Sequence, residues 1–250
     1  MQRPAFILAE LALISVLGAL VQIPLFAQQA PGAKGRGNRP GTKAGEVITA
    51  PDRSERWTNQ LKIGSRAPEF TLQRLDKSEK RNAPEKPPLK TPQTVLLREL
   101  RAQRPVVLIF GSMTCPPFRG QLDGVDQVYE QFKDRVEFLF VYIREAHPDS
   151  VLSVVASDGR ESLLKISQPT DLSARAASAA VCQRTLKLSM PIAVDDIDNR
   201  VGKAYAGWPN RMVVVDTDGT ILYASDPAPG GTNAKRLRTW LEENLVRDGD

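Results

Sequence analysis

The sequence predicts an α/β domain in which a central mixed sheet is flanked by helices. Apolar, β-branched runs at 105–110, 136–143 and 191–195 are typical of strands, and segments with helical periodicity separate them. A strand, a helical crossover and a further strand make a parallel unit. Nearer the C-terminus, the runs at 211–216 and 220–225 flank DTDG, which indicates an antiparallel hairpin. Parallel and antiparallel strands together give a mixed sheet with helices on its faces.

Before the first long strand, the sequence predicts an edge strand, a polar loop and a short helix or turn. APEFTL at 67–72 favours an edge strand, and the charged, Pro-rich stretch 77–93 is too polar for a core. TVLLRELRAQ at 94–103 places its leucines on one side of a short helix or turn. PVVLIF at 105–110 is apolar throughout, so we expect a strand that is buried on both faces. We place this strand at the centre of the sheet, between the second long strand and the first hairpin strand.

Four helices are expected after the central strand. The helix at 116–135 carries two prolines in its first turn, where their missing N–H groups are not needed. The segment 171–188 is a helix capped by the threonine or the aspartate at its start. IDNRVGKAYAG at 197–207 is a third helix, and AKRLRTWLEENL at 234–245 closes the domain as an amphipathic helix.

The N-terminal part of the chain is expected to lie outside the folded domain. Residues 1–30 combine Arg3 with an almost unbroken apolar run from Phe6 to Phe26, which is typical of a signal peptide. Because about 20 apolar residues can span a bilayer, an N-terminal membrane anchor at 6–26 is the alternative. Residues 31–56 are rich in Pro, Gly and cations, so we expect a disordered basic linker. The folded domain is then 57–250, exported to the periplasm or cell envelope, or secreted.

The positive charge of the chain is concentrated in its first half. Residues 31–105 carry 17 Lys and Arg against 8 Asp and Glu, whereas residues 106–250 carry 16 against 20. A nucleic-acid-binding domain needs a cationic face on its folded body. This distribution therefore excludes nucleic acid as an expected partner, and the basic excess is interpreted as a solvated tail and loop.

Two side chains with reactive groups follow neighbouring strands of the predicted sheet. Cys115 comes after the first long strand and His147 after the second. Because the carboxyl ends of parallel strands meet at one edge, we expect both residues at that edge. Cys115 precedes Pro116 and Pro117 at a helix N-terminus, where unpaired N–H groups favour a thiolate with a lowered pKa. The alternative is an inert, buried thiol.

Several motifs resemble those of one enzyme family. The iodothyronine deiodinases, which belong to the redoxin branch of the thioredoxin-fold superfamily, contain segments similar to GSMTCPPF, YIREAHP, VDDIDNRVGKAYA and PNRMVVVDTDGTILYASDPAPGG. The resemblance covers most of residues 92–246 and implies a thioredoxin-like fold. It also implies that Cys115 is the nucleophile, with sulfur in place of the selenium that the family normally uses there.

The resemblance further implies roles for residues around Cys115. Glu145 and His147 match the acidic and imidazole groups of the family's proton-handling network, and Arg211 matches an arginine that can stabilise the anion of the nucleophile. Four more residues are expected to support the site: Ser112, Thr114, Tyr142 and Pro209. The last of these stands where thioredoxin-like folds often have a cis-proline.

The sequence therefore predicts an exported, thiol-dependent oxidoreductase that performs reductive dehalogenation, or a related two-electron reduction, on a small molecule. An external thiol reductant or thioredoxin-like donor would regenerate Cys115, and we expect neither a metal nor a bound cofactor. Pro169 stands where the family usually has a second histidine, which disfavours iodothyronine itself as the substrate. The alternatives are a peroxiredoxin-like thiol peroxidase and a non-catalytic, envelope-tethered binding module. Membrane tethering, homodimer formation and pairing of Cys115 with Cys182 remain open.

Overall fold

The structure is a computed structural model, and it describes residues 43–54, 57–58, 61–75, 93–156, 158–226 and 231–245. The predicted signal peptide or anchor at 1–30, and the part of the predicted linker before Lys43, lie outside these residues. Within the described ranges, no helix is both long enough and apolar enough to span a membrane.

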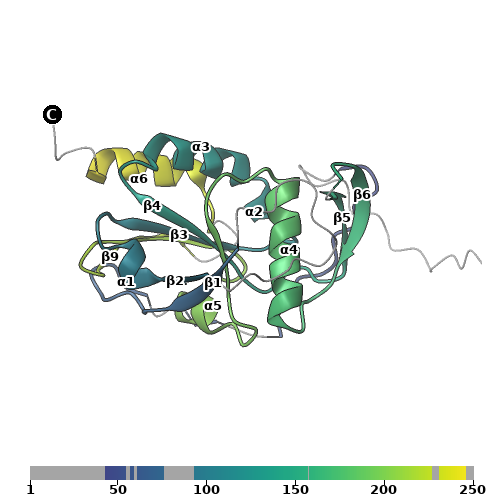
Figure 1. Ribbon diagram of the computed structural model, residues 1–250, viewed down its shortest axis with the longest axis horizontal. Coiled ribbons are helices and arrows are strands. Elements are labelled where there is room, and N and C mark those ends of the chain that lie inside the picture. Colours follow the sequence, from purple (N-terminus) through teal and green to yellow (C-terminus); the bar gives the residue numbers. More distant parts are fainter. Residues whose placement is uncertain are drawn as a thin grey trace, which may run out of the picture. The chain divides into compact units, whose positions relative to one another are not determined.

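The centre of the domain is a seven-stranded mixed sheet (Figure 1). In their order across the sheet, the strands are β2 (Thr94–Leu96), β1 (Thr71–Arg74), β7 (Ile192–Val194), β4 (Glu137–Tyr142), β3 (Val106–Gly111), β8 (Arg211–Val215) and β9 (Ile221–Ala224). The β7–β4 and β4–β3 pairs are parallel, and the remaining pairs are antiparallel. The predicted mixed sheet is confirmed, with the first long strand between the second one and the hairpin.

Helices cover both faces of this sheet (Figure 1). One face carries α2 (Pro116–Arg119), α3 (Leu122–Phe132), α4 (Leu172–Thr185) and α6 (Ala234–Leu245). The opposite face carries α1 (Leu97–Leu100) and α5 (Arg200–Ala204). The α4 helix begins at one of its two predicted caps, because Asp171 Oδ1 accepts a hydrogen bond from Ala174 N at 2.8 Å.

The central strand β3 is buried on both faces, as its unbroken apolar sequence predicts. Val107 and Ile109 face the core under α3 and α6, whereas Leu108 and Phe110 face the core under α5. Each of these four side chains is 0% exposed. Burial of one such side chain contributes about 1.5–3 kcal/mol, so β3 is an anchor for the loop that follows it.

Three elements differ from the sequence prediction. Of the short helix or turn expected at 94–103, Thr94–Leu96 form the strand β2, and the helix α1 covers only Leu97–Leu100. The helix expected at 116–135 is divided into α2 and α3, and the break falls at Gly120 and Gln121. Glycine weakens a helix, and the backbone N–H of Gln121 bonds to the carbonyl oxygen of Phe118, three residues earlier, instead of continuing the α-helical pattern. The strand expected at the sheet edge, β1, is paired on both sides, and the short β2 forms that edge.

A separate two-stranded hairpin was absent from the sequence prediction. It consists of β5 (Ser150–Val155) and β6 (Glu161–Ile166), which pair antiparallel. Alternate residues of β5 are buried, whereas all of β6 except Ile166 is exposed. The sequence of β6 therefore lacks the apolar alternation by which a half-buried strand is recognised.

The segment 43–54 packs on the domain, although its composition predicted a disordered linker and a domain that starts at Trp57. Val47 forms an antiparallel bridge with Val151 of β5. The Glu46 side chain is 2% exposed and pairs with Arg119, with Nη2 and Oε2 3.0 Å apart. The prediction was wrong here because this segment is held by polar contacts, which leave no apolar period in the sequence.

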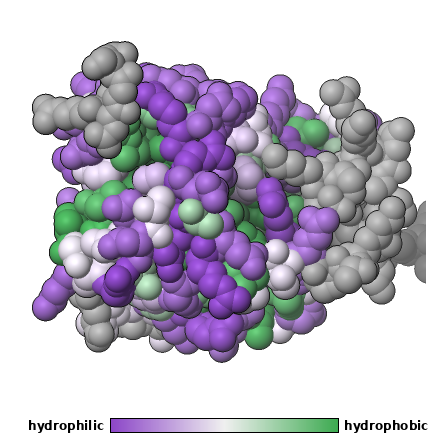
Figure 2. Space-filling view, turned by 60° about the vertical axis from the view of Figure 1, so that its left-hand side comes forward, coloured by the Kyte–Doolittle hydropathy of each residue, from purple (hydrophilic) through white to green (hydrophobic). Residues whose placement is uncertain are grey.

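The surface is largely hydrophilic on the face shown in Figure 2, with hydrophobic residues visible between hydrophilic ones. The most exposed large hydrophobic side chains within the described ranges are Val47, Ile63, Leu163, Leu164 and Ile197. They lie on the N-terminal segment, the β5–β6 hairpin and loops, away from the central strands. The candidate site described in the next section lies instead at the buried ends of the central strands β3, β4 and β8.

Candidate active site

The loops after β3 and β4 meet at one edge of the sheet. Gly111 and Tyr142 are partners at the ends of these two parallel strands. In the loops that follow, the backbone N–H of His147 donates a hydrogen bond to Thr114 Oγ1 at 3.0 Å. The prediction that Cys115 and His147 follow strands ending at the same edge is therefore confirmed.

Cys115 is the residue that precedes the first turn of α2. Its side chain is 1% exposed and belongs to the core under α3 and α6. Asn210 Nδ2 donates a hydrogen bond to Sγ at 3.2 Å. Gly111 makes room for the adjacent Phe118 ring, since a Cβ at that position would lie 2.4 Å from it. The sulfur is thus enclosed, with the Asn210 amide directed at it.

The lowered thiol pKa predicted from the sequence is not what the structure gives. Burial raises the pKa of Cys115 above its ordinary value, and the nearby Glu145 carboxylate raises it further. The Phe118 N–H, the Asn210 amide and the Arg119 guanidinium lower this pKa, but by less. The prediction failed because α2 has only four residues and a small dipole, while desolvation of a thiolate is costly.

Alkylation of Cys115 by iodoacetamide is therefore expected to be slow at neutral pH and to accelerate into the alkaline range. A thiol pKa above the usual value of about 8.5 leaves little thiolate at neutrality, and that fraction grows about tenfold per pH unit below the pKa. The measurement is the modification rate of the Cys115 peptide by mass spectrometry, with a synthetic peptide of residues 111–118 as the reference. A profile with its midpoint near neutrality, below that of the peptide, would contradict the dominance of burial.

Glu145 is a fully buried carboxyl group in a network of donors. Its Oε2 accepts hydrogen bonds from Thr114 N at 3.1 Å and Thr114 Oγ1 at 2.7 Å. Its Oε1 accepts a hydrogen bond from the Tyr142 hydroxyl, and Ser112 also contributes a side-chain hydrogen bond. Burial raises the pKa of Glu145, although these donors oppose the increase. The network joins the loop of the thiol to the loop of the imidazole.

Tyr142 and Ser112 connect this carboxyl group to the backbone of the same loops. The Tyr142 hydroxyl accepts from Met113 N at 3.2 Å, and Ser112 Oγ accepts from Ala146 N at 3.1 Å. Burial raises the pKa of Tyr142 well above its ordinary value, so its hydroxyl remains a donor to Glu145. Three of the predicted supporting residues, Ser112, Thr114 and Tyr142, thus lie in one buried network.

The imidazole of His147 is half-buried and is held by the N-terminal segment. Its Nδ1 lies 2.8 Å from the carbonyl oxygen of Thr49. A carbonyl oxygen can only accept, so Nδ1 carries the proton, and Nε2 of the neutral ring is a proton acceptor. The N-terminal segment therefore sets which ring nitrogen can take part in proton transfer. Sequence reasoning missed Thr49 because its contribution is a backbone atom.

Arg211 is buried, but it lies on the other face of the sheet from the sulfur. In β8 it shares its side with Val213 and Val215, which pack in the core under α5. Its guanidinium donates to the carbonyl oxygens of Ser225 and Tyr205, each at 3.1 Å. The expectation that Arg211 stabilises the nucleophile's anion is therefore wrong for this geometry, because side chains alternate along a strand.

The residue that does reach the sulfur from this strand is Asn210, one position earlier. It follows Pro209, and the Trp208–Pro209 peptide bond is cis, as the resemblance implied. Sequence reasoning missed Asn210, although the period of two along the strand was a usable signal: Met212 and Val214 face the same core as Cys115. An amide side chain on the Cys115 face of the sheet was thus a candidate hydrogen-bond donor to the sulfur.

Cys182 is packed in the core, as predicted. It lies on α4, is 0% exposed, and burial raises its thiol pKa strongly. Both cysteines are free thiols. The structure therefore shows a single candidate nucleophile at the edge of the sheet and a second thiol that fills the core.

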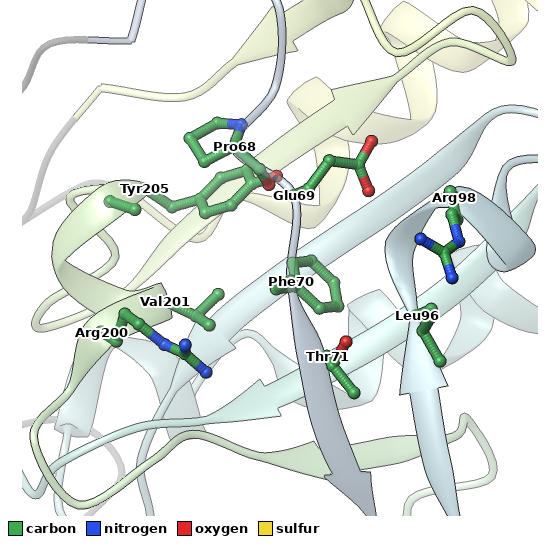
Figure 3. Close-up of a pocket in the computed structure, with 10 residues that line it drawn as sticks. Pro68, Glu69, Phe70, Thr71, Leu96, Arg98, Arg200, Val201 and Tyr205 are labelled. Atoms are coloured by element: carbon green, nitrogen blue, oxygen red, sulfur yellow. Dashed lines mark hydrogen bonds between the residues drawn. The ribbon is translucent and has the colours of Figure 1, made fainter.

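Two cavities lie on opposite sides of the sheet. One, of about 750 Å³, opens beside the candidate nucleophile, because Met113 and Pro116 line it together with Arg119 and Ile48. The other, of about 300 Å³, lies between the segment around Phe70 and α5 (Figure 3). As far as the structure describes the chain, neither Cys115 nor His147 lines either cavity. The first cavity is lined by Met113 and Pro116, which flank Cys115 in the sequence, so it is the candidate entrance for a substrate.

Fold and site together define a class of protein. A mixed sheet with this topology, a cysteine at the start of the helix after β3 and a cis-proline before β8 are features of thioredoxin-fold thiol oxidoreductases. At the level of the fold, the solved structure of Mycobacterium bovis AhpC is similar, with a TM-score of 0.50 and 17% sequence identity over 77% of this chain and 97% of that chain.

The chain belongs to the iodothyronine deiodinase family, whose family model matches residues 44–245. It is 35% identical over 147 residues to "Thyroxine 5-deiodinase" of Gallus gallus, a match that covers 59% of this chain and 54% of that protein. It is 30% identical over 190 residues to "Type II iodothyronine deiodinase" of Rattus norvegicus, covering 75% and 71%. The chain spans about half the length of the thyroxine 5-deiodinases that it matches.

Proposed function

We propose that the protein is an exported, thiol-dependent oxidoreductase that removes a halogen reductively from a small aromatic molecule, with Cys115 as its nucleophile. The observation that carries the proposal is the placement of Cys115 Sγ at hydrogen-bond distance from the Asn210 amide, in the loop that the Glu145 network holds, in a member of the deiodinase family. The Tyr142–Glu145–Thr114 contacts lead from the sulfur's loop to His147.

The proposed reaction balances in one step between thiol and substrate. The sulfur attacks the iodine of an aryl iodide, the carbon–iodine bond breaks, and a sulfur–iodine bond forms. The thiol proton passes to Nε2 of His147 and from there to the carbon, so that the aryl iodide becomes an arene. Sulfur loses two electrons and the carbon gains them. A polarisable sulfur suits a soft halogen, and a positioned imidazole lowers the cost of moving the proton.

Regeneration requires an external dithiol or a thioredoxin-like donor. One thiol of the donor attacks the sulfenyl iodide, which releases iodide and a proton and leaves a mixed disulfide on Cys115. The second thiol then resolves the mixed disulfide and restores the cysteine. Cys182 is an unsuitable resolving thiol because it is enclosed in the core with a raised pKa.

The substrate is proposed to enter through the cavity beside α2. Its lining combines apolar side chains, Ile48, Met113 and Leu186, with charged groups of both signs: Lys43, Arg119 and Lys187, and Glu46, Asp123, Asp126 and Glu130. A ligand with an aromatic body and a hydroxyl group fits such a lining. We propose that metals and bound cofactors take no part, and that the physiological partners are this small molecule and its thiol reductant.

We base the proposed location on the sequence of the N-terminal part. Arg3 and the apolar run from Phe6 to Phe26 support export, either by a cleaved signal or with residues 6–26 as a tether in the cell envelope. The domain would then work in the periplasm, at the envelope or as a secreted protein. A homodimer is compatible with this arrangement.

One observation favours a second candidate, a non-catalytic binding module. The Cys115 thiol is 1% exposed and its pKa is raised, which are properties of a structural cysteine. In this case the cavity beside α2 would bind a ligand without chemistry.

A parallel assay of the full chain separates these candidates. The protein is given an iodinated phenol, hydrogen peroxide or a small disulfide, each with an excess of dithiol. We expect release of iodide from the phenol above the rate of dithiol alone. Consumption of peroxide alone would assign a thiol peroxidase instead, and no turnover of any substrate, together with binding of the phenol, would assign the binding module.

A further inference from the structure

The side chain of Asn210 bridges the candidate nucleophile and the segment that leads into α6. Its Nδ2 lies 3.2 Å from Cys115 Sγ, and its Oδ1 accepts a hydrogen bond from the Thr232 backbone N–H at 2.6 Å. The side chain is 0% exposed. We propose that Asn210 is a catalytic residue that stabilises the Cys115 thiolate by donating an amide hydrogen bond to it. This inference rests on the proposed function, because it concerns the same sulfur.

Thr232 fixes which end of the amide faces the sulfur. A backbone N–H can only donate, so the amide atom that it meets must be the oxygen, and the NH₂ group is left facing Cys115. Gly231 permits this close approach, since a Cβ there would lie 2.0 Å from the backbone oxygen of Asn210. The orientation of the amide is therefore set by the fold before any thiolate forms.

A hydrogen-bond donor at the sulfur favours the anion over the thiol. A thiol is a weak acceptor, whereas a thiolate is charged, and hydrogen bonds to charged groups are about twice as strong as neutral ones. The Asn210 amide thus stabilises the state that attacks more than the resting state. An interaction that strengthens as charge develops on the nucleophile lowers the barrier of the chemical step.

Asn210 also takes the role at the sulfur that was expected of the Arg211 guanidinium. Arg211 is turned to the other face of the sheet, where it binds the carbonyl oxygens of Ser225 and Tyr205. A neutral amide needs no counter-ion when the sulfur is protonated, so it suits an enclosed site. The strand therefore offers the sulfur a donor without burying a second charge beside it.

The test is the pH dependence of Cys115 alkylation in two variants of the full chain, Asn210→Ala and Asn210→Asp. Iodoacetamide is used, and modification of the Cys115 peptide is followed by mass spectrometry. We expect the midpoint of the profile to rise by about one pH unit in Asn210→Ala, which is about tenfold less thiolate at a given pH. Asn210→Asp should raise it at least as much, because a carboxylate repels the anion. The pH midpoints of the variants are compared, rather than their absolute rates, because a rate also depends on the access of iodoacetamide to the sulfur.

Asn233→Ala is the matched control. Asn233 lies in the same segment as Thr232, but its Oδ1 accepts from Arg236 N at 3.0 Å, so its removal should leave the midpoint unchanged. Asn210→Asp preserves side-chain size and is the variant to use if Asn210→Ala does not fold. An unchanged midpoint in a folded Asn210 variant overturns the inference, even where the wild-type protein releases iodide. If the midpoint rises in the Asn210 variants but the wild-type protein releases no iodide, the role of Asn210 is supported and the proposed function is contradicted.

Discussion

Replacement of Cys115 by serine is expected to reduce turnover at least about a thousandfold. A serine hydroxyl keeps its proton at neutral pH, and its oxygen is a poor nucleophile toward a soft atom such as iodine. Because the position is 1% exposed and the two side chains are similar in size, the variant should keep the fold. The measurement is the rate of iodide release from an iodinated phenol with dithiol present, together with thermal unfolding of the same samples.

The matched control for this prediction is Cys182→Ser. This residue is buried in the core on α4, so the variant is expected to lose stability by about 1–3 kcal/mol, because it places a hydroxyl among apolar side chains. Its turnover below the unfolding temperature should stay close to that of the wild-type protein. Equal loss of turnover in both variants would show that sulfur at position 115 has no special part in the chemistry.

Replacement of Glu145 by glutamine is expected to lower turnover about a hundredfold. The carboxylate accepts from two groups of Thr114 and from the Tyr142 hydroxyl, so every neighbour is a donor. An amide must direct its NH₂ at one of them. If it faces Tyr142, whose oxygen already accepts from Met113 N, the phenol proton loses its acceptor. The loops of Cys115 and His147 then lose the group that joins them.

The second expected consequence of Glu145→Gln is a stability loss of about 1–3 kcal/mol, the cost of a buried donor without a partner. Turnover and unfolding by denaturant are measured on the same variant, with Glu137→Gln as the control. Glu137 starts β4, the strand that leads to Glu145, at the opposite end from the site, and pairs with Arg104 near the surface. Full turnover in Glu145→Gln would mean that the buried network is structural only.

The parts of the fold that follow from apolar patterns could be predicted from the sequence. PVVLIF and VEFLFVYI are long, apolar and β-branched, and the hydrophobic effect leaves such segments few places other than the centre of a sheet. The hairpin turn DTDG was recognisable because its residues tolerate the required backbone angles, and Gly219 has a φ of 92°. The placement of Cys115 and His147 at one edge then followed from strand direction alone.

The parts held by polar contacts could not be predicted in this way. The strand β6 is exposed, so ESLLKI has no alternation that distinguishes it from a loop. The segment 43–54 binds through Glu46, a backbone carbonyl at Thr49 and similar groups whose partners are about a hundred residues away. The choice between Asn210 and Arg211 depended on the register of β8, and a shift of one residue exchanges the faces of the sheet.

The contacts of residues 43–54 bear on how the protein should be shortened for laboratory work. A fragment that begins at Trp57 would retain every strand of the sheet, yet it would lack the Thr49 oxygen that accepts the hydrogen bond of His147 Nδ1 and the Glu46 carboxylate beside Arg119. Kinetics recorded on such a fragment would describe an imidazole without the Thr49 contact that holds the proton on Nδ1. A fragment for crystallisation or kinetics should therefore start upstream of Lys43.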